Sequence, residues 1–188
     1  MLWRRRLRAA PHEHARTGFA RAAETVLAHY MESVHALGAE LSISTEYIKV
    51  SDAVLTLAEA SHDTGRSRED EPYRRALTGI YARLSATHEK LTGKRAARPA
   101  PLQGEPYAEP GQLREELAAI ARGLAAEGAG PLASGGALGR LIRAVETFGF
   151  HLATLDMRQN SAIHERVIAE LLKAAGVCDD YLALDEEA

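Results

Sequence analysis

The residues best suited to chemistry in this sequence are three polar side chains, Asp156, Arg158 and Gln159, at the end of an apolar run. The run, Phe150 to Met157, is apolar on both alternating faces, which predicts a strand covered on both sides, as in parallel sheets and barrels. Polar groups at the carboxyl ends of such strands commonly bind ligands. Arginine at that place suits a phosphate or a carboxylate, because its planar guanidinium can bind either group in a bidentate manner.

Arg158 is the leading candidate for a catalytic and substrate-binding residue, since a helix N-terminus just beyond it would add positive partial charge. Asp156 and Gln159 are better suited to positioning the arginine than to reacting themselves. A purely structural interpretation is also open, in which Arg158 forms an ion pair with Asp156 or Glu165. The residues alone do not decide between these two interpretations.

Predicted helices surround this strand and occupy most of the chain. Apolar residues recur at three- and four-residue steps from about Ala15 to Gly38, which predicts an amphipathic helix. Ser51 is a plausible N-cap for a second helix, Pro72 opens a third, and Ser161 caps a last helix that Gly176 closes. The expected fold class is therefore mainly α with one short barrel-type strand. A lone strand leaves its backbone polar groups unpaired, so its sheet is expected to come from sequence that is absent here.

Four segments follow from this pattern. Residues 1–14 are basic and are expected to form a disordered lead-in, and residues 15–92 form a helical, hairpin-like segment. Residues 93–110 contain four prolines and are predicted to be a linker, because proline interrupts helices and central strands. Residues 111–188 hold further helices, the predicted strand at 150–157 and the helix after it.

Composition excludes several classes of function. The 188 residues are 46% hydrophobic and 26% charged, with a net charge of −3, which is typical of an ordinary soluble protein. That charge predicts no general attraction to nucleic acid or to anionic membranes. Cys178 is the only cysteine, so a disulfide framework and a cysteine zinc site are excluded, and a cytoplasmic setting is expected.

The spacing of four residues also suggests a competing class of protein, a metal-binding helical bundle. Glu32 with His35, and Glu59 with His62, have the Glu-x-x-His spacing that di-iron bundles use. Such ligands must project inward, however, and on a helical wheel both glutamates lie away from the apolar stripe of their helix. We therefore reject the metal bundle.

The segment Phe148-Gly-Phe-His-Leu-Ala-Thr-Leu-Asp-Met-Arg-Gln-Asn-Ser-x-x-His-Glu165 resembles a part of bacterial phosphoenolpyruvate carboxylase. That part contributes one barrel strand and one active-site arginine to the enzyme. The resemblance extends to Ala133–Arg143, to Glu71-Pro-Tyr-Arg74 and to Leu37–Ser44, in the family's order. It covers most of the chain from about Phe19 onward.

This resemblance implies a fragment of a larger, mostly helical enzyme built around a TIM-like β-barrel, with residues 111–188 forming part of the catalytic barrel. The family converts phosphoenolpyruvate and bicarbonate to oxaloacetate and phosphate with Mg²⁺ or Mn²⁺, and it typically forms homotetramers. Arg158 would correspond to an arginine that helps to hold phosphoenolpyruvate. The family's catalytic-histidine motif and acidic metal ligands are not found here, so we expect no metal ligand and no activity from this piece alone. The alternative is a non-catalytic helical interaction or scaffold module derived from that enzyme.

Overall fold

The computed structural model describes residues 3–152 and 161–183 of the chain. Side chains are described from Gly18 onward, except those of Leu132 and Ser161. None of the residues in these two ranges lies in a β-strand. The predicted mainly α class is therefore confirmed for the described part of the chain.

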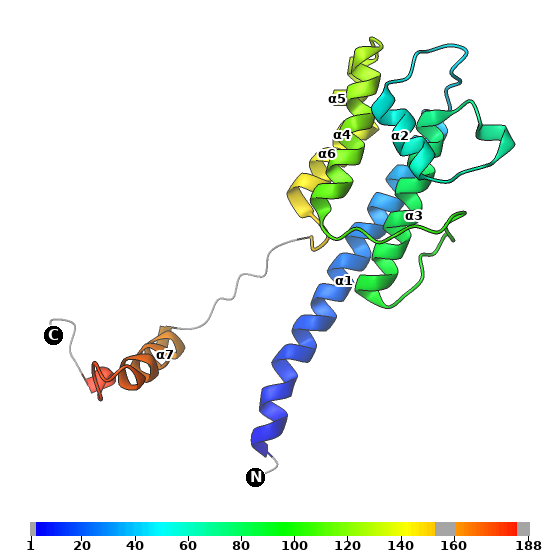
Figure 1. The fold of residues 1–188 in the computed structure, drawn as a ribbon. Helices are drawn as coiled ribbons and strands as arrows, with labels where there is room; N and C mark the ends of the chain where they lie inside the picture. The colour runs from blue at the N-terminus through cyan, green and yellow to red at the C-terminus, as the bar shows by residue number, and fades with distance from the viewer. Residues whose placement is uncertain (1–2, 153–160, 184–188) are drawn as a thin grey trace. The chain divides into compact units, whose positions relative to one another are not determined.

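The chain divides into two compact units, Met1–Ala153 and Thr154–Ala188. The described helices of the first unit follow one another in the order that Figure 1 shows. They are α1 Trp3–Glu40, α2 Asp52–Ala60, the 3-10 helix η1 Arg66–Arg68, α3 Pro72–Thr92, α4 Pro110–Ala126, α5 Gly130–Ser134 and α6 Ala137–Phe148. The second unit has α7 Ser161–Ala174 and the 3-10 helix η2 Tyr181–Ala183.

Proline and glycine set several of the helix ends. Pro72 is the first residue of α3, as predicted, and Pro110 is the first residue of α4. A missing N–H costs nothing there, because the first turn of a helix has no acceptor for it. Helix α3 ends at Gly93, whose φ of 71° lies in the left-handed region that glycine adopts without steric cost. Gly176, with a φ of 67°, follows the end of α7 as predicted.

The start of α1 differs from the prediction, whereas that of α2 agrees with it. Helix α1 begins at Trp3, well before Ala15, because apolar periodicity identifies only the part of a helix that has a packed face. Ser51 occupies the N-cap position of α2, but its hydroxyl makes no capping bond. None of the described helices, α1 included, combines the length and the apolarity that crossing a membrane requires.

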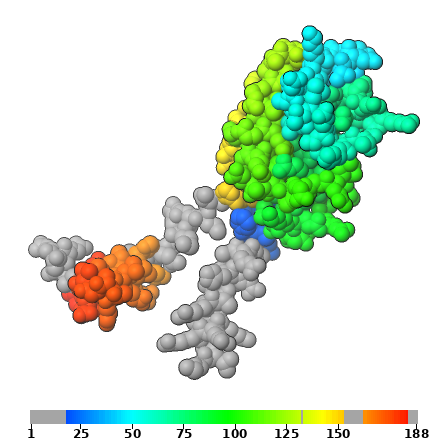
Figure 2. All heavy atoms as spheres, viewed as in Figure 1, coloured from blue at the N-terminus to red at the C-terminus, as the bar shows by residue number. Residues whose placement is uncertain are grey.

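Helices α1 and α3 pack along each other and supply most of the core of the first unit (Figure 1). In the space-filling view the coloured atoms of this unit are closely packed (Figure 2). The predicted apolar stripe of α1 is confirmed, since all of its members are buried. They are Ala23, Val26, Leu27, Tyr30, Val34, Leu37 and Leu41.

Tyr30 also connects α1 to α6. Its hydroxyl donates a hydrogen bond of 2.9 Å to the carbonyl oxygen of Ala144, and burial raises the pKa of that hydroxyl to about 12. The bond satisfies a phenol that would otherwise be buried without a partner. Helix α6, which leads to the predicted site segment, is thereby fixed to the core.

The prediction of a strand from Phe150 to Met157 is wrong for its first residues. Phe150 and His151 lie in a turn, and the backbone N–H groups of His151 and Leu152 both donate to the carbonyl oxygen of Phe148. These bonds continue the turns of the backbone beyond the C-terminus of α6. An extended backbone there would need a neighbouring strand, and the described residues contain none. Residues 153–157 lie outside the described residues.

A buried ion pair, Asp63 with Arg68, fixes the loop between α2 and α3. Asp63 is 4% exposed, and its carboxylate accepts bonds of 2.7 Å and 2.9 Å from Nε and Nη2 of Arg68. The backbone N–H of Gly65 donates a further bond of 3.0 Å. The bonds from Arg68, with a smaller contribution from Gly65, hold the pKa of Asp63 below its usual value despite its burial.

This pair makes a testable contribution to stability. Asp63→Asn should lower the free energy of unfolding at neutral pH by about 2 kcal/mol, between the values for exposed and buried pairs. The folded-state pKa lies below the unfolded value of about 3.9. The stabilisation is therefore complete above pH 4 or so, and it is lost as pH falls through the lower, folded-state pKa. Urea unfolding across this range measures the loss.

Asp70→Asn is the control for Asp63→Asn, because Asp70 lies in the same loop but is exposed. The control should leave the neutral-pH stability and its decline below about pH 4 nearly unchanged. If Asp63→Asn shows the same acid-dependent slope as the unaltered chain, the ion pair does not stabilise the loop.

Candidate functional site

The three predicted site residues, Asp156, Arg158 and Gln159, lie outside the described residues, so their positions stay predictions. The structure describes the chain on both sides of them. On one side α6 and its turn are described to Leu152, and on the other α7 is described from Ser161.

Phe150 fixes the N-terminal flank to the core of the first unit. It is 7% exposed, and its ring centroid lies 6.4 Å from that of Tyr107. Gly149, the residue before it, has a φ of 52°, which turns the backbone sharply after α6. The segment that leads to Arg158 therefore starts from a buried aromatic contact with residues 93–110.

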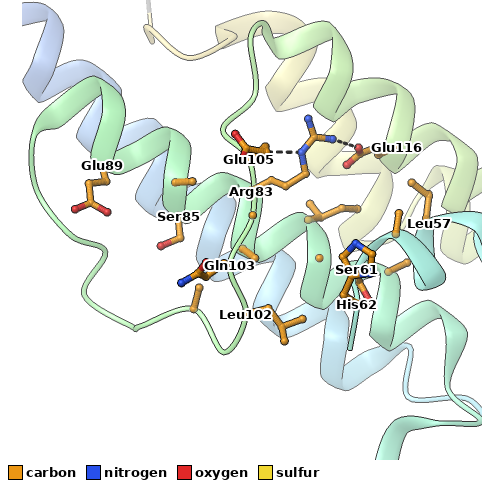
Figure 3. A pocket seen from close by; sticks show the side chains of 18 residues that line it. Leu57, Ser61, His62, Arg83, Ser85, Glu89, Leu102, Gln103, Glu105 and Glu116 are labelled. Carbon is orange, nitrogen blue, oxygen red and sulfur yellow. Dashed lines mark hydrogen bonds and ion pairs between the residues drawn. The ribbon is translucent and has the colours of Figure 1, made fainter. Parts of the chain in front are cut away.

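Arg83, Tyr107 and Glu116, which we call the Tyr107 cluster, come from α3, from residues 93–110 and from α4. The guanidinium carbon of Arg83 lies 4.0 Å from the centroid of the Tyr107 ring. Nη1 of Arg83 bonds to one carboxylate oxygen of Glu116, and the Tyr107 hydroxyl donates to the other. Figure 3 shows the bond between Arg83 and Glu116. One carboxylate thus joins three separate parts of the chain.

The side chains of the Tyr107 cluster stabilise the fold by pairing with one another. Tyr107 is 2% exposed, and burial raises the pKa of its hydroxyl far above the usual value. The charge of Glu116 acts in the same direction, so this phenol stays protonated at physiological pH. The backbone N–H of Tyr107 donates a 2.8 Å bond to the hydroxyl of Thr87, which itself donates to the carbonyl oxygen of Arg83. Both hydrogen-bond donors of the tyrosine, its backbone N–H and its hydroxyl, are therefore paired.

A cavity of about 690 Å³ lies beside this cluster, between α2, α3 and residues 100–105 (Figure 3). Half of its lining residues are alanine, serine or glycine, and Glu89 and Glu105 are among the charged ones. The guanidinium of Arg83 is held by Glu116 and by a 3.2 Å bond from its Nε to the carbonyl oxygen of Glu105. The Ser61 hydroxyl donates to the carbonyl oxygen of Ala58 at 2.6 Å. No paired nucleophile and base appears among these described groups.

The described residues contain no group of three His, Cys, Asp or Glu side chains that could hold a metal ion. Glu32 on α1 and Glu59 on α2 are both exposed, as the helical wheel predicts. Neither glutamate therefore projects into the interior of a bundle, where a di-iron site would need it.

Sequence reasoning missed the Tyr107 cluster because it interpreted residues 93–110 as a linker. One signal was present, since Tyr107 is the only aromatic residue in that proline-rich stretch. A large aromatic side chain among small and polar residues favours a buried contact. No local pattern identifies its partners, because Arg83 and Glu116 are 33 positions apart.

The Tyr107 cluster gives a prediction about stability. Tyr107→Phe keeps the ring contacts with Arg83 and Phe150 but removes the hydroxyl that bonds to Glu116. It should lower the free energy of unfolding by about 1.5–3 kcal/mol, the usual effect of losing a hydrogen bond to a charged group. Urea unfolding of the 188-residue chain at neutral pH measures this change.

Tyr47→Phe is the matched control, because Tyr47 is 81% exposed and its loss of a hydroxyl should change stability by less than about 0.5 kcal/mol. Equal stabilities for the two variants would show that the bond between Tyr107 and Glu116 contributes nothing.

Comparison with known proteins gives one consistent result. A family model described as phosphoenolpyruvate carboxylase matches residues 12–188. The phosphoenolpyruvate carboxylase of Aromatoleum aromaticum is 51% identical over 166 residues, which cover 88% of this chain and 18% of that protein. The enzyme of Azoarcus sp. strain BH72 is 50% identical over 164 residues, covering 87% of this chain and 18% of the relative. The enzyme of Ralstonia nicotianae is 48% identical over 166 residues, which cover 88% of this chain and 17% of that protein. The chain thus spans less than a fifth of the length of these curated relatives.

Proposed function

This chain belongs to the phosphoenolpyruvate carboxylase family, and on that premise we propose that it supplies one part of that enzyme's active site. The observation that carries the proposal is the family match over residues 12–188, which includes the sequence Asp156-Met-Arg-Gln159. The complete enzyme would convert phosphoenolpyruvate and bicarbonate to oxaloacetate and phosphate. The activity belongs to that complete enzyme, since this chain covers 17–18% of the three relatives named above.

The proposed reaction has two steps in which negative charge must be stabilised. A bicarbonate oxygen attacks the phosphorus of phosphoenolpyruvate, so that the bond from phosphorus to the enol oxygen breaks and carboxyphosphate and the enolate of pyruvate form. The enolate carbon then attacks the carboxyl carbon of carboxyphosphate, and phosphate leaves. Both steps concentrate charge on phosphate and enolate oxygens, which fixed cationic groups stabilise.

Arg158 is the residue of this chain that we assign to that role. Its guanidinium is charged at any physiological pH, and its planar donors fit two phosphate or carboxylate oxygens at once. Helix α7 begins at Ser161, three positions after the arginine in the sequence, so its N-terminus would add partial positive charge near the guanidinium. Asp156 and Gln159 would position the guanidinium.

The family's divalent ion, Mg²⁺ or Mn²⁺, would add Lewis-acid stabilisation of the same oxygens. The described residues do not fit that ion, because no three carboxylate, imidazole or thiol groups lie together among them. We therefore derive no step through a metal from this chain. Its ligands are expected in the rest of the enzyme.

We also propose the wider setting of the chain. The complete enzyme would be a mostly helical cytoplasmic homotetramer built around a TIM-like β-barrel, to which residues 111–188 contribute. The alternative of a non-catalytic helical module has no observation in its favour.

The test of the site assignment is Arg158→Ala in a complete enzyme that contains this segment. Turnover should fall by about 10²–10³, the usual effect of removing one group that stabilises transition-state charge. Arg158→Lys should recover only part of the loss, because lysine keeps the charge but not the planar fork. Steady-state kinetics with varied phosphoenolpyruvate, together with circular dichroism, separates lost chemistry from lost folding.

Arg122→Ala is a suitable control, since Arg122 is exposed on α4 and makes no ion pair within the described residues. Its turnover should be near that of the unaltered enzyme. Near-normal activity of Arg158→Ala would overturn the site assignment.

A further inference from the structure

Residues 94–106, which we call the strap, run along α3 without regular secondary structure (Figure 1). Pro99, Pro101 and Pro106 have no N–H to donate. Among the described residues, no backbone N–H of residues 95–106 donates to another backbone group. The strap is therefore held by side chains rather than by a backbone ladder.

Hydrogen bonds from α3 side chains hold the strap at three places, and ion pairs of Lys94 with Glu24 and of Arg95 with Glu89 add to the first of them. Nδ1 of His88 lies 3.0 Å from the carbonyl oxygen of Lys94. The hydroxyl of Tyr81 donates a 2.9 Å bond to the carbonyl oxygen of Arg98. Nε of Arg83 donates a 3.2 Å bond to the carbonyl oxygen of Glu105. Most strap residues between these points are exposed. Segments with few buried contacts and isolated hydrogen bonds open at lower free energy than the rest of a fold.

Both ends of the strap are better fixed than its middle. At one end Gly93 terminates α3 in the left-handed conformation, a backbone state that allows the chain direction to change. At the other end Tyr107 is buried in the Tyr107 cluster. The strap is thus a weakly held segment between two defined ends.

The strap forms one wall of the cavity described above, through Ala100, Leu102, Gln103 and Gly104. Gly104 approaches the α3 backbone so closely that a Cβ there would lie 2.7 Å from the backbone nitrogen of Arg83 and 2.9 Å from the carbonyl carbon of Ala82. Only glycine allows this contact. Ala82 lines the cavity and is buried.

We propose that the strap is a hinged cover. It detaches from α3 as a unit between Gly93 and the Tyr107 cluster, and this opens the cavity and exposes Ala82 while the helices stay folded. The inference rests on the geometry of the first unit and is independent of the proposed function.

The rate at which a buried thiol reacts measures this opening. Cys178→Ser first removes the only native cysteine from the 188-residue chain. Ala82→Cys then places a thiol beneath the strap, and in a second protein Ala23→Cys places one in the α1 core, where the residue is 0% exposed. Under native conditions, dithiobis(nitrobenzoate) should modify the thiol at position 82 at least about tenfold faster than the thiol at position 23.

Gly104→Ala should raise the rate at position 82 about tenfold, because the added methyl group cannot fit against the α3 backbone, and should leave the rate at position 23 unchanged. Gly111→Ala is the control, since a Cβ there has no neighbour closer than 3.8 Å. Tyr81→Phe, which only frees the carbonyl of Arg98, should give a smaller increase and serves if Gly104→Ala does not fold. Equal rates at the two positions, or parallel increases at both, would overturn the proposal.

Discussion

The carboxylate of Glu116 receives hydrogen bonds from two side chains, the guanidinium of Arg83, 33 positions away in the sequence, and the hydroxyl of Tyr107, nine positions away. Each of these groups needs the others. A buried phenol without an acceptor costs about 1–3 kcal/mol, and a partly buried guanidinium needs a counter-charge. Because the three residues come from α3, residues 93–110 and α4, their mutual satisfaction fixes the relative placement of these parts within the first unit.

The Tyr107 cluster also contacts Phe150, which precedes the segment proposed to act in catalysis. Phe150 packs against Tyr107, so the chain leaves α6 from a buried contact before it reaches Arg158. Helix α6 is itself held through Tyr30 and Ala144. Catalytic side chains must be held to within a fraction of an ångström, and that precision comes from packed supporting residues rather than from the reacting group. Within the first unit, such packing is described as far as Leu152.

The features that could be predicted from the sequence are those whose cause is local. The apolar stripe of α1, Pro72 at the start of α3 and Gly176 after α7 all depend on neighbours within a few residues. The strand at Phe150 failed because a strand requires a partner, and none lies among the described residues. Tyr107 was missed because its partner Arg83 lies far away in the sequence. The ion pair of Asp63 with Arg68 spans only five positions, but spacing alone does not show that a loop carboxylate is buried.

The arginines of this chain divide by whether a carboxylate already holds them. Asp63 holds Arg68, Glu71 holds Arg74 and Glu116 holds Arg83, and each pair neutralises a charge that a substrate would otherwise meet. A substrate-binding arginine must instead keep part of its charge and its donors available for phosphate oxygens. The assignment of Arg158 thus depends on Asp156. If this carboxylate accepts both donors of the guanidinium fork, Arg158 joins the structural pairs, and if it accepts only one, the arginine is oriented and still able to bind an anion.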